Sequence, residues 1–350
     1  MENSQLVSIT FLAYTIIISV GSINCIDNNN LVTNQSALFV FGDSVFDAGN
    51  NNYIDTFSSV RSNYWPYGQT TFKSPTGRVS DGRLIPDFIA EYAWLPLIPP
   101  NLQPFNGNNQ FTYGVNFASG GAGALVGTFS GLVINLRTQL NNFKKVEKML
   151  RSKLGDAEGK RVISRAVYLF HIGLNDYQYP FTTKSSIFQS ISNEKYVDYV
   201  VGNMTDVFKE VYNLEEGRSC FQPVTKLINL HNKKLLNGLR RLNHELSGFK
   251  YALHDYHTSL SERMNNPSKY GFKEGKKACC GSGPLRGINT CGGRMGLSQN
   301  YELCENVTDY LFYDPFHLTE KANQQIAELI WSGPTNITGP YNLKALFELN

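Results

Sequence analysis

A serine, a histidine and an aspartate are the residues of this chain whose types and neighbours fit nucleophilic chemistry. Ser44 follows the apolar run LFVF at 38–41 through Gly42 and Asp43. A strand that ends in such a turn exposes the serine hydroxyl and the serine N–H together. A serine hydroxyl is a poor nucleophile until a base takes its proton, and Gly-Asp-Ser is also an ordinary turn sequence. Ser44 is therefore a nucleophile only if the chain supplies a base.

His317 is the candidate base. It lies in FYDPFHLTE, and Asp314 stands three residues before it. Pro315 favours extended backbone at Asp314, so the carboxylate can reach Nδ1–H of His317 and leave Nε2 to take the serine proton. The alternative for Asp314 is a charge at a helix N-terminus. Among the other histidines, four fall inside strand or helix patterns and one ends a strand and stays an alternative base: His171, His231, His244 and His254, and then His257.

Acyl transfer also needs donors where negative charge develops on an oxygen. Gly120 in NFASGGAG offers a backbone N–H that a substrate can approach closely. Asn175 in HIGLNDY offers a side-chain amide, and the Ser44 N–H would be the third donor. The alternatives are a flexible turn at Gly120 and a helix cap or turn at Asn175. GGAGALVG is followed by no Walker lysine, and no H-E-x-x-H or C-x-x-C occurs, so no cofactor or metal is expected.

Apolar runs and helical spacings alternate along the chain. Strands are predicted at 38–41, 165–173 and 249–257, helices at 81–96, 132–154, 194–214, 224–248 and 319–331, and a small-residue loop at 114–125. Thr319 suits the N-cap of the last helix. This alternation predicts a parallel sheet covered on both faces, with ligands bound at the carboxyl ends of its strands. Ser44 and Asn175 each follow a predicted strand and should lie on that rim.

The alternation breaks once. Two helices and no strand lie between the strands at 165–173 and 249–257. The helices are joined by EEGRSCFQP, which is too polar for a buried parallel strand, although nine residues can span about 30 Å. One interior strand of the sheet is therefore expected to be missing.

The N-terminus predicts export. Leu6 to Val20 is an uncharged, mostly apolar run of 15 residues, shorter than the about 20 that a membrane-spanning helix needs. It has the length of the apolar part of a signal peptide, although MENSQ before it carries Glu2 and no Lys or Arg. The alternative is a buried strand or helix of the mature fold. We predict cleavage after Cys25, a signal peptide at 1–25, a single domain at 26–350, secretion, and no stable membrane anchor.

Cysteines and sequons agree with that compartment. Four sequons occur, at Asn34, Asn203, Asn306 and Asn336. In an oxidising compartment the cluster of Cys279, Cys280, Cys291 and Cys304 predicts two disulfides. Neighbouring Cys279 and Cys280 are expected to bond different partners, and zinc is the disfavoured alternative. If Cys25 leaves, Cys220 is the odd cysteine. The net charge of +3 over 350 residues gives no reason to expect nucleic acid.

The four blocks FGDSVFDAGN, NFASGGAG, IGLNDY and DPFHLTE hold Ser44, Gly120, Asn175 and His317 in that order. They resemble the blocks of the GDSL esterases and lipases of the SGNH hydrolase superfamily. GRVSDGRLIPDFIAEYAWLPL, KACCGSG and the N-terminal run resemble its secreted plant branch.

The resemblance implies a flavodoxin-like, three-layer α/β/α sandwich with a five-stranded parallel sheet. It also implies hydrolysis of lipid or aryl/acyl esters through an acyl-enzyme, without metal or cofactor. Ser44 would be the nucleophile and Asp314 with His317 its base system. Ser44, Gly120 and Asn175 would form the oxyanion hole, with Gly121 as a substitute for Gly120. Some plant relatives are associated with defence, which extends to this chain only by analogy.

The chain departs from the plant pattern where the alternation breaks. The family has a strand and a cysteine-containing loop after the helix that ends near Leu214, whereas here NLEEG runs into RSCFQ. We predict an internally shortened chain, such as an alternative splice product, that lacks a segment between Gly217 and Arg218. That segment would carry the missing strand and the partner of Cys220. Two alternatives follow: a catalytically impaired, non-enzymatic form that acts as an interaction protein, and an acyltransferase that passes the acyl group to an alcohol.

Overall fold

The computed structural model describes residues 15–20, 36–104, 111–183, 185–213, 225–246, 249–287, 290–291 and 301–348. Its strands are β1 (Thr15–Val20), β2 (Leu38–Gly42), β3 (Gly114–Asn116), β4 (Val167–His171), β5 (Phe249–His254), β6 (Glu274–Ala278), β7 (Cys280–Gly281), β8 (Glu302–Leu303), β9 (Tyr310–Phe312) and β10 (Thr338–Pro340). The α-helices are α1 (Ile85–Tyr92), α2 (Leu136–Leu154), α3 (Asp156–Ser164), α4 (Leu174–Thr182), α5 (Ile187–Ser190), α6 (Asn193–Asn213), α7 (Thr225–Glu245), α8 (Tyr256–Asn265), α9 (Glu320–Ser332) and α10 (Leu343–Glu348). Short 3-10 helices are η1 (Asn50–Tyr53), η2 (Ser58–Val60), η3 (Pro267–Tyr270), η4 (Pro284–Arg286) and η5 (Val307–Asp309).

The main sheet has the strand order β10-β5-β1-β4-β2-β3 in the part of the chain that the structure describes. β2 pairs in parallel with both β3 and β4. β1 runs antiparallel to β4 and to β5, so β4 and β5 are parallel to each other. β10 adds an antiparallel edge. The predicted α/β fold with a mainly parallel sheet is confirmed, but two of the six strands run against the parallel direction that the prediction gave to the whole sheet.

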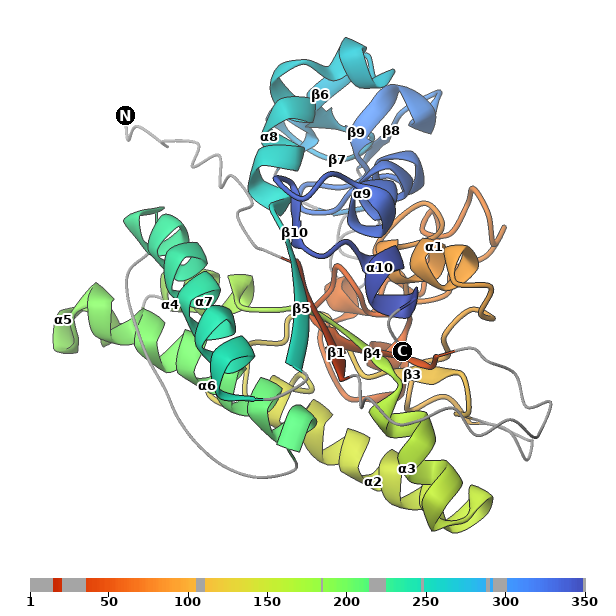
Figure 1. Ribbon diagram of the computed structural model, residues 1–350. Helices are drawn as coiled ribbons and strands as arrows, with labels where there is room; N and C mark the ends of the chain where they lie inside the picture. The colour runs from red at the N-terminus through yellow and green to blue at the C-terminus, as the bar shows by residue number, and fades with distance from the viewer. Residues whose placement is uncertain are drawn as a thin grey trace.

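The interior position between β4 and β5 is filled from the N-terminus (Figure 1). The strand there is β1, which comes from the apolar run that the sequence assigns to a signal peptide. In the structure this run is a strand of the main sheet, which was the alternative interpretation. Both neighbours are buried strands whose facing N–H and C=O groups need partners. The sheet therefore has no gap at the position where the sequence predicts a missing strand.

Helices cover both faces of the sheet, as Figure 1 shows. On one face α2, α6 and α7 pack against strand residues that include Phe39, Tyr168 and Tyr251. On the other face α1, α9 and α10 pack against alternate residues of the same strands, such as Val40 and Ala252. The alternation follows from the period of two in a strand. The predicted three layers are thereby observed.

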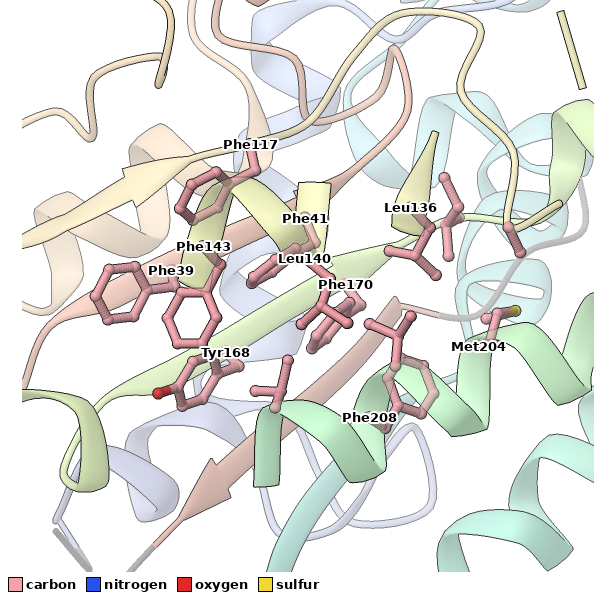
Figure 2. Close-up of a cluster of buried hydrophobic side chains, with 14 of the residues drawn as sticks. Phe39, Phe41, Phe117, Leu136, Leu140, Phe143, Tyr168, Phe170, Met204 and Phe208 are labelled. Carbon is pink, nitrogen blue, oxygen red and sulfur yellow. The ribbon is translucent and has the colours of Figure 1, made fainter. Parts of the chain in front are cut away.

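An aromatic cluster fixes β2 against its neighbours (Figure 2). The rings of Phe41 and Phe170 lie 4.7 Å apart between centroids, and Phe39 meets Phe143 of α2 edge-on at 5.3 Å. All four side chains are fully buried, and burying one apolar side chain of this size stabilises the fold by roughly 2–3 kcal/mol. This packing holds the strand that ends at Ser44.

Most predicted elements appear within a few residues of their expected bounds. The predicted loop at 114–125 begins as β3, and the last helix is α9, whose N-cap Thr319 accepts a hydrogen bond from the Ala322 N–H. The sequence did not predict α3, α4, α8 and α10. The whole connection between α6 and α7, residues 214–224 with EEGRSCFQP and Cys220, lies outside the described residues, as do Cys25 and Asn34.

Candidate active site

The turn after β2 presents Ser44. Gly42 ends the strand with φ of +158°, and a Cβ built there would lie 2.5 Å from the carbonyl oxygen of His171, so the parallel neighbour β4 leaves no room for a side chain. The Asp43 N–H then donates to that same carbonyl oxygen at 3.0 Å. The N–H groups of Phe46 and Asp47 bond back to the Asp43 carbonyl oxygen. Ser44 is left half-buried at the strand end.

The structure brings Ser44, His317 and Asp314 together. Nε2 of His317 lies 2.9 Å from Oγ of Ser44, and Nδ1 of His317 lies 2.8 Å from Oδ1 of Asp314. The serine comes from the end of β2 and the other two from the connection between β9 and α9, 273 residues along the chain. Both distances allow hydrogen bonds, and the order of atoms is that of a nucleophile, its base and a group that orients the base.

Asp314 is completely buried and fully hydrogen-bonded. Its Oδ1 accepts from the N–H groups of Phe316 and His317, both at 2.9 Å. Its Oδ2 accepts from the Tyr67 hydroxyl at 2.6 Å. Burial by itself would raise the pKa of Asp314, but the charge and hydrogen bond of His317, with the Tyr67 and Phe316 bonds, lower that pKa below its ordinary value. Asp314 is therefore a carboxylate at neutral pH that holds Nδ1–H of the histidine.

Tyr67 was not found by sequence reasoning. It lies 247 residues from Asp314 in the sequence and within no pattern that marks a site. Its ring is fully buried between Tyr64 and Tyr313, at centroid distances of 5.4 and 5.5 Å. Only the folded chain places its hydroxyl on the carboxylate.

The predicted oxyanion donors are arranged differently from the expectation. The Gly120 N–H already donates to Oδ2 of Asp47 at 2.9 Å, so it is not free to meet a substrate oxygen. Among the described residues, the N–H groups of Ser44 and of Gly121 have no acceptor, and Gly121 has φ of +85°. The half-buried Asn175, in the first turn of α4, donates one amide hydrogen to the Ala122 carbonyl oxygen at 2.9 Å. In this segment the Gly121 N–H is therefore open, whereas the Gly120 N–H is occupied by Asp47.

Asp47 joins the two glycine-containing segments of the site. Its Oδ1 accepts from the N–H groups of Gly49 and Asn50 at 2.8 and 2.7 Å, and its Oδ2 accepts from Gly120. The side chain is fully buried, and that burial raises its pKa to about 6 in spite of these bonds. Asp47 stands two residues before Gly49 and three before Asn50, a spacing typical of an Asx-turn, which could have marked this residue in the sequence.

The other buried histidines are structural, as predicted. Nδ1 of His171 lies 3.1 Å from Oδ1 of Asp43, Nδ1 of His231 lies 3.0 Å from the Tyr177 hydroxyl, and His254 bonds Thr338 at 2.8 Å. Burial lowers the pKa of His231 to about 4 and that of His254 to about 3. His231 and His254 therefore stay neutral in the folded protein near pH 7. The histidine beside Ser44 is His317 rather than His257.

A small cleft that is open to solvent lies next to His317. Its lining is mainly apolar and includes Val45, Leu174, Tyr256, Leu260 and Phe316. Val45 follows the serine directly, and Phe316 precedes the histidine. Apolar side chains therefore border the histidine that contacts Ser44.

Two disulfides lie in the smaller region of β6 to β9, Cys279–Cys304 and Cys280–Cys291. Neighbouring cysteines bond different partners, as predicted, so the zinc alternative is wrong for these four. Within the described ranges there is no cluster of His, Cys, Asp or Glu suited to a metal ion. No described helix is long and apolar enough to cross a bilayer. Of the sequon asparagines, Asn306 and Asn336 are exposed, and Asn203 is half-buried in α6.

A serine–histidine–aspartate arrangement at the strand ends of a three-layer α/β sandwich defines a class of hydrolases. The family model described as GDSL-like Lipase/Acylhydrolase matches residues 38–330, and the chain belongs to this family. It is similar to GDSL esterase/lipase 1 and GDSL esterase/lipase 2 of Arabidopsis thaliana, with identities of 89% and 75% over the whole of both chains. A GDSL lipase of Tanacetum cinerariifolium is 48% identical over 89% of this chain and 88% of its own. These relationships identify a carboxylic ester hydrolase.

The chain is shorter than the relative at 89% identity. Their alignment covers 374 positions, whereas this chain has 350 residues, so at least 24 aligned positions hold no residue of this chain. That agrees with a shortened chain, and a segment of about this length suffices for a strand with its connections. The place of the shortening, between Gly217 and Arg218, stays a prediction.

Proposed function

We propose that this hydrolase cleaves carboxylic esters through an acyl-enzyme on Ser44. The observation that carries the proposal is the 2.9 Å contact between Oγ of Ser44 and Nε2 of His317. His317 takes the serine proton as Oγ bonds to the ester carbonyl carbon, and gives that proton to the departing alcohol. Water then attacks the acyl group with the same histidine as base, which releases the acid and restores the serine.

Negative charge on the carbonyl oxygen would be stabilised by donors around Ser44. We assign the N–H groups of Ser44 and Gly121, which have no acceptor among the described residues, and the Asn175 amide. Removal of one such donor typically lowers kcat by a factor of about 10²–10³. Asp314 stays ionised and stabilises the imidazolium that His317 becomes.

The substrate class follows from the cleft. Its apolar lining beside His317 favours an ester with an apolar acyl or aryl group of short to medium length. The non-enzymatic alternative requires the serine and histidine to lie apart, and the hydrogen-bonded geometry favours the enzyme instead.

Turnover of p-nitrophenyl butyrate tests the mechanism. Ser44→Ala should lower kcat by about 10⁴-fold or more, because no other group takes over the nucleophile. Ser74→Ala is the matched control, since Ser74 is exposed and bonds only the Phe72 carbonyl oxygen. Mass spectrometry of a rapidly quenched reaction should show the acyl group on the peptide that contains Ser44. Turnover in Ser44→Ala equal to that of the unchanged protein would contradict the proposal.

We also propose that the chain enters the secretory pathway. Two disulfides form in oxidising compartments, and the exposed sequon residues Asn306 and Asn336 are accessible to glycosylation. Expression in plant cells should give protein in the medium whose mass falls on treatment with a glycosidase that removes N-linked sugars. Protein found only inside cells and unchanged by the enzyme would contradict this.

A further inference from the structure

The segment GRVSDGR at 77–83 belongs to the stretch that resembles the plant branch, and none of its residues takes part in the proposed ester hydrolysis. Its first six residues are buried, although the segment lies in no helix or strand. Buried backbone of this kind needs partners elsewhere in the fold. The Gly68 N–H donates to the Ser80 carbonyl oxygen at 3.0 Å, and the Thr70 N–H donates to that of Asp81 at 2.7 Å. The side chains of the segment reach two other places, the turn after β2 and the loop between β9 and α9.

The first half of the segment holds the turn after β2. Nη1 of Arg78 donates to the Ala48 carbonyl oxygen in that turn at 3.2 Å. The guanidinium is itself fixed by Asp87 through two bonds of 2.8 Å, and both side chains are buried. Gly77 packs so closely that a Cβ there would lie 2.7 Å from Cα of Gly49. The serine turn is therefore joined to this half of the segment by a hydrogen bond from a fixed side chain and by backbone packing.

The second half of the segment holds the chain that follows His317. The Ser80 hydroxyl donates to the carbonyl oxygen of Leu318, the next residue, at 3.0 Å. Oδ1 of Asp81 accepts from the Glu320 N–H at 2.8 Å. Glu320 is the first residue of α9, and the N–H groups of a first helical turn have no acceptor within their own helix. Asp81 supplies that acceptor from outside the helix.

The last two residues of the segment fit the same helix start. A Cβ on Gly82 would lie 2.1 Å from Oε2 of Glu320, so a side chain there would displace this carboxylate. The same carboxylate pairs with Nε of Arg83 at 2.5 Å. The Arg83 carbonyl oxygen accepts from the Asn323 side-chain amide at 3.2 Å. All four residues of SDGR therefore contact the chain directly after His317 or the first turn of α9.

The middle of the segment borders the cleft. Val79 is buried and lines the cleft next to His317, and Leu84, directly after the segment, lines it as well. Among the described residues, those that line the cleft include neither Ser80 nor Asp81. Replacement of these two residues should therefore leave the substrate contacts in place.

We propose that the segment 77–83 is a brace that sets the approach of His317 to Ser44. Ser80 and Asp81 are its positioning residues, because they hold the histidine loop while the first half of the brace holds the serine turn. The 2.9 Å contact between Nε2 and Oγ joins residues 273 positions apart, and bonds within either loop cannot set that distance. A misplacement of about 1 Å can cost about 100-fold in turnover. The proposal rests on the proposed ester hydrolysis, since it concerns the position of the base in that reaction.

Removal of one hydroxyl tests the brace against a matched control. Ser80→Ala removes a buried hydroxyl that donates to a carbonyl oxygen. Tyr168→Phe also removes one hydroxyl that donates to a carbonyl oxygen, that of Ile163, at the opposite end of β4 from His171. Both should lower the unfolding midpoint by about 2 °C. Only Ser80→Ala should lower kcat for p-nitrophenyl butyrate, by about tenfold with KM within twofold. Equal kcat in the two variants would overturn the proposal.

Two replacements of Asp81 test whether its acceptor oxygen is what positions the loop. Asp81→Ala leaves the Glu320 N–H without its acceptor, and kcat should fall by about 100-fold. Asp81→Asn keeps an oxygen in the place of Oδ1 and should restore kcat to within about threefold of the unchanged protein. An asparagine variant as slow as the alanine variant, or an alanine variant with full kcat, would overturn the proposal.

Hydrogen exchange gives a measurement that does not need turnover. In the full chain, the peptide that contains residues 315–320 should exchange faster in Asp81→Ala than in the unchanged protein, and Tyr168→Phe should show no such change. Equal exchange in Asp81→Ala and the unchanged protein would overturn the brace. The expected difference in exchange, found in a protein without ester turnover, would support the brace and count against the ester hydrolysis alone.

Discussion

β2 and β1 lie two positions apart in the same sheet, and both are short apolar runs. β2 leads directly into the candidate site, because it ends at Gly42 and Ser44 lies two residues further along the chain. Its residues are buried on both faces. β1 contains no candidate site residue. Its partners among the described strands, β4 and β5, begin 152 or more residues away from Thr15. The turn that presents Ser44 is therefore specified by neighbouring residues, whereas the pairing of β1 depends on distant segments.

This difference separates two kinds of variant. Changes at the end of β2 and in the loop of His317 should abolish turnover while leaving the free energy of unfolding nearly unchanged. Changes in the packing beneath the site should lower that free energy first, and turnover as a consequence. The predictions below test that separation, beginning with the largest effect.

Asp314→Asn should lower kcat by about 10³–10⁴-fold. An asparagine carries no negative charge, so it can no longer stabilise the imidazolium that His317 becomes when it takes the serine proton. The unfolding midpoint should stay near that of the unchanged protein, because the new Oδ1 can still accept from the Phe316 and His317 N–H groups. Asp309→Asn, in the same segment but outside the site, is the control. A loss of less than tenfold would mean that Asp314 does not orient the histidine.

Local patterns predicted the parts of the molecule that depend on short stretches of chain. The runs that form β2, β4 and β5 are apolar and end in turn residues, and Thr319 caps α9 through its own side chain. The spacing of Asp314 and His317 predicted their contact. The two residues lie three positions apart, and an extended residue followed by a turn brings the carboxylate within reach of the imidazole. Each of these features is decided by neighbours in the sequence.

The features that sequence reasoning missed depend on contacts between distant segments. The Tyr67 hydroxyl bonds Asp314 across 247 residues, and the Gly120 N–H is taken by Asp47 across 73. The run that forms β1 has a composition that suits both a signal peptide and a strand, and its pairing with β4 and β5 joins segments far apart in the sequence. No local signal contains that information.

Asp47→Ala should lower the free energy of unfolding by about 3 kcal/mol, because three backbone N–H groups lose their acceptor in a buried place. Turnover should also fall, since the Gly120 segment is then no longer tied to the serine turn. Urea unfolding at pH 7.5 with ester turnover measures both. The fully exposed carboxylate of Asp55 lies close by in the sequence, and Asp55→Ala should change neither quantity. If Asp47→Ala unfolds like Asp55→Ala, the carboxylate does not hold the two segments together.

His231→Gln should alter how stability depends on pH. Burial lowers the pKa of His231 to about 4 in the folded protein, against about 6.5 in the unfolded chain. As the pH falls below 6.5 the unfolded chain binds a proton that the folded protein does not, so stability is lost as the pH falls toward 4. From pH 7 to pH 5 this amounts to about 2 kcal/mol.

The glutamine variant cannot bind that proton, so its stability should fall by about 2 kcal/mol less over the same interval. The difference is measured by urea unfolding at both pH values, and the exposed His244→Gln is the control. A parallel pH dependence in His231→Gln and the unchanged protein would show that His231 is not held neutral by burial.

Tyr67→Phe should have the smallest effect, a decrease in kcat of about tenfold with KM nearly unchanged. The variant keeps the ring contacts with Tyr64 and Tyr313 and removes only the hydroxyl that donates to Oδ2 of Asp314. That hydrogen bond contributes to the lowered pKa of Asp314, so the pKa should rise in the variant and the acid limb of the kcat profile should move to higher pH. Loss of one buried hydrogen bond costs about 1 kcal/mol of stability. Tyr53→Phe, at an exposed tyrosine, is the control. An unchanged acid limb with lowered stability would make Tyr67 a packing residue alone, whereas a shifted limb would show that its hydroxyl acts on the charge of Asp314.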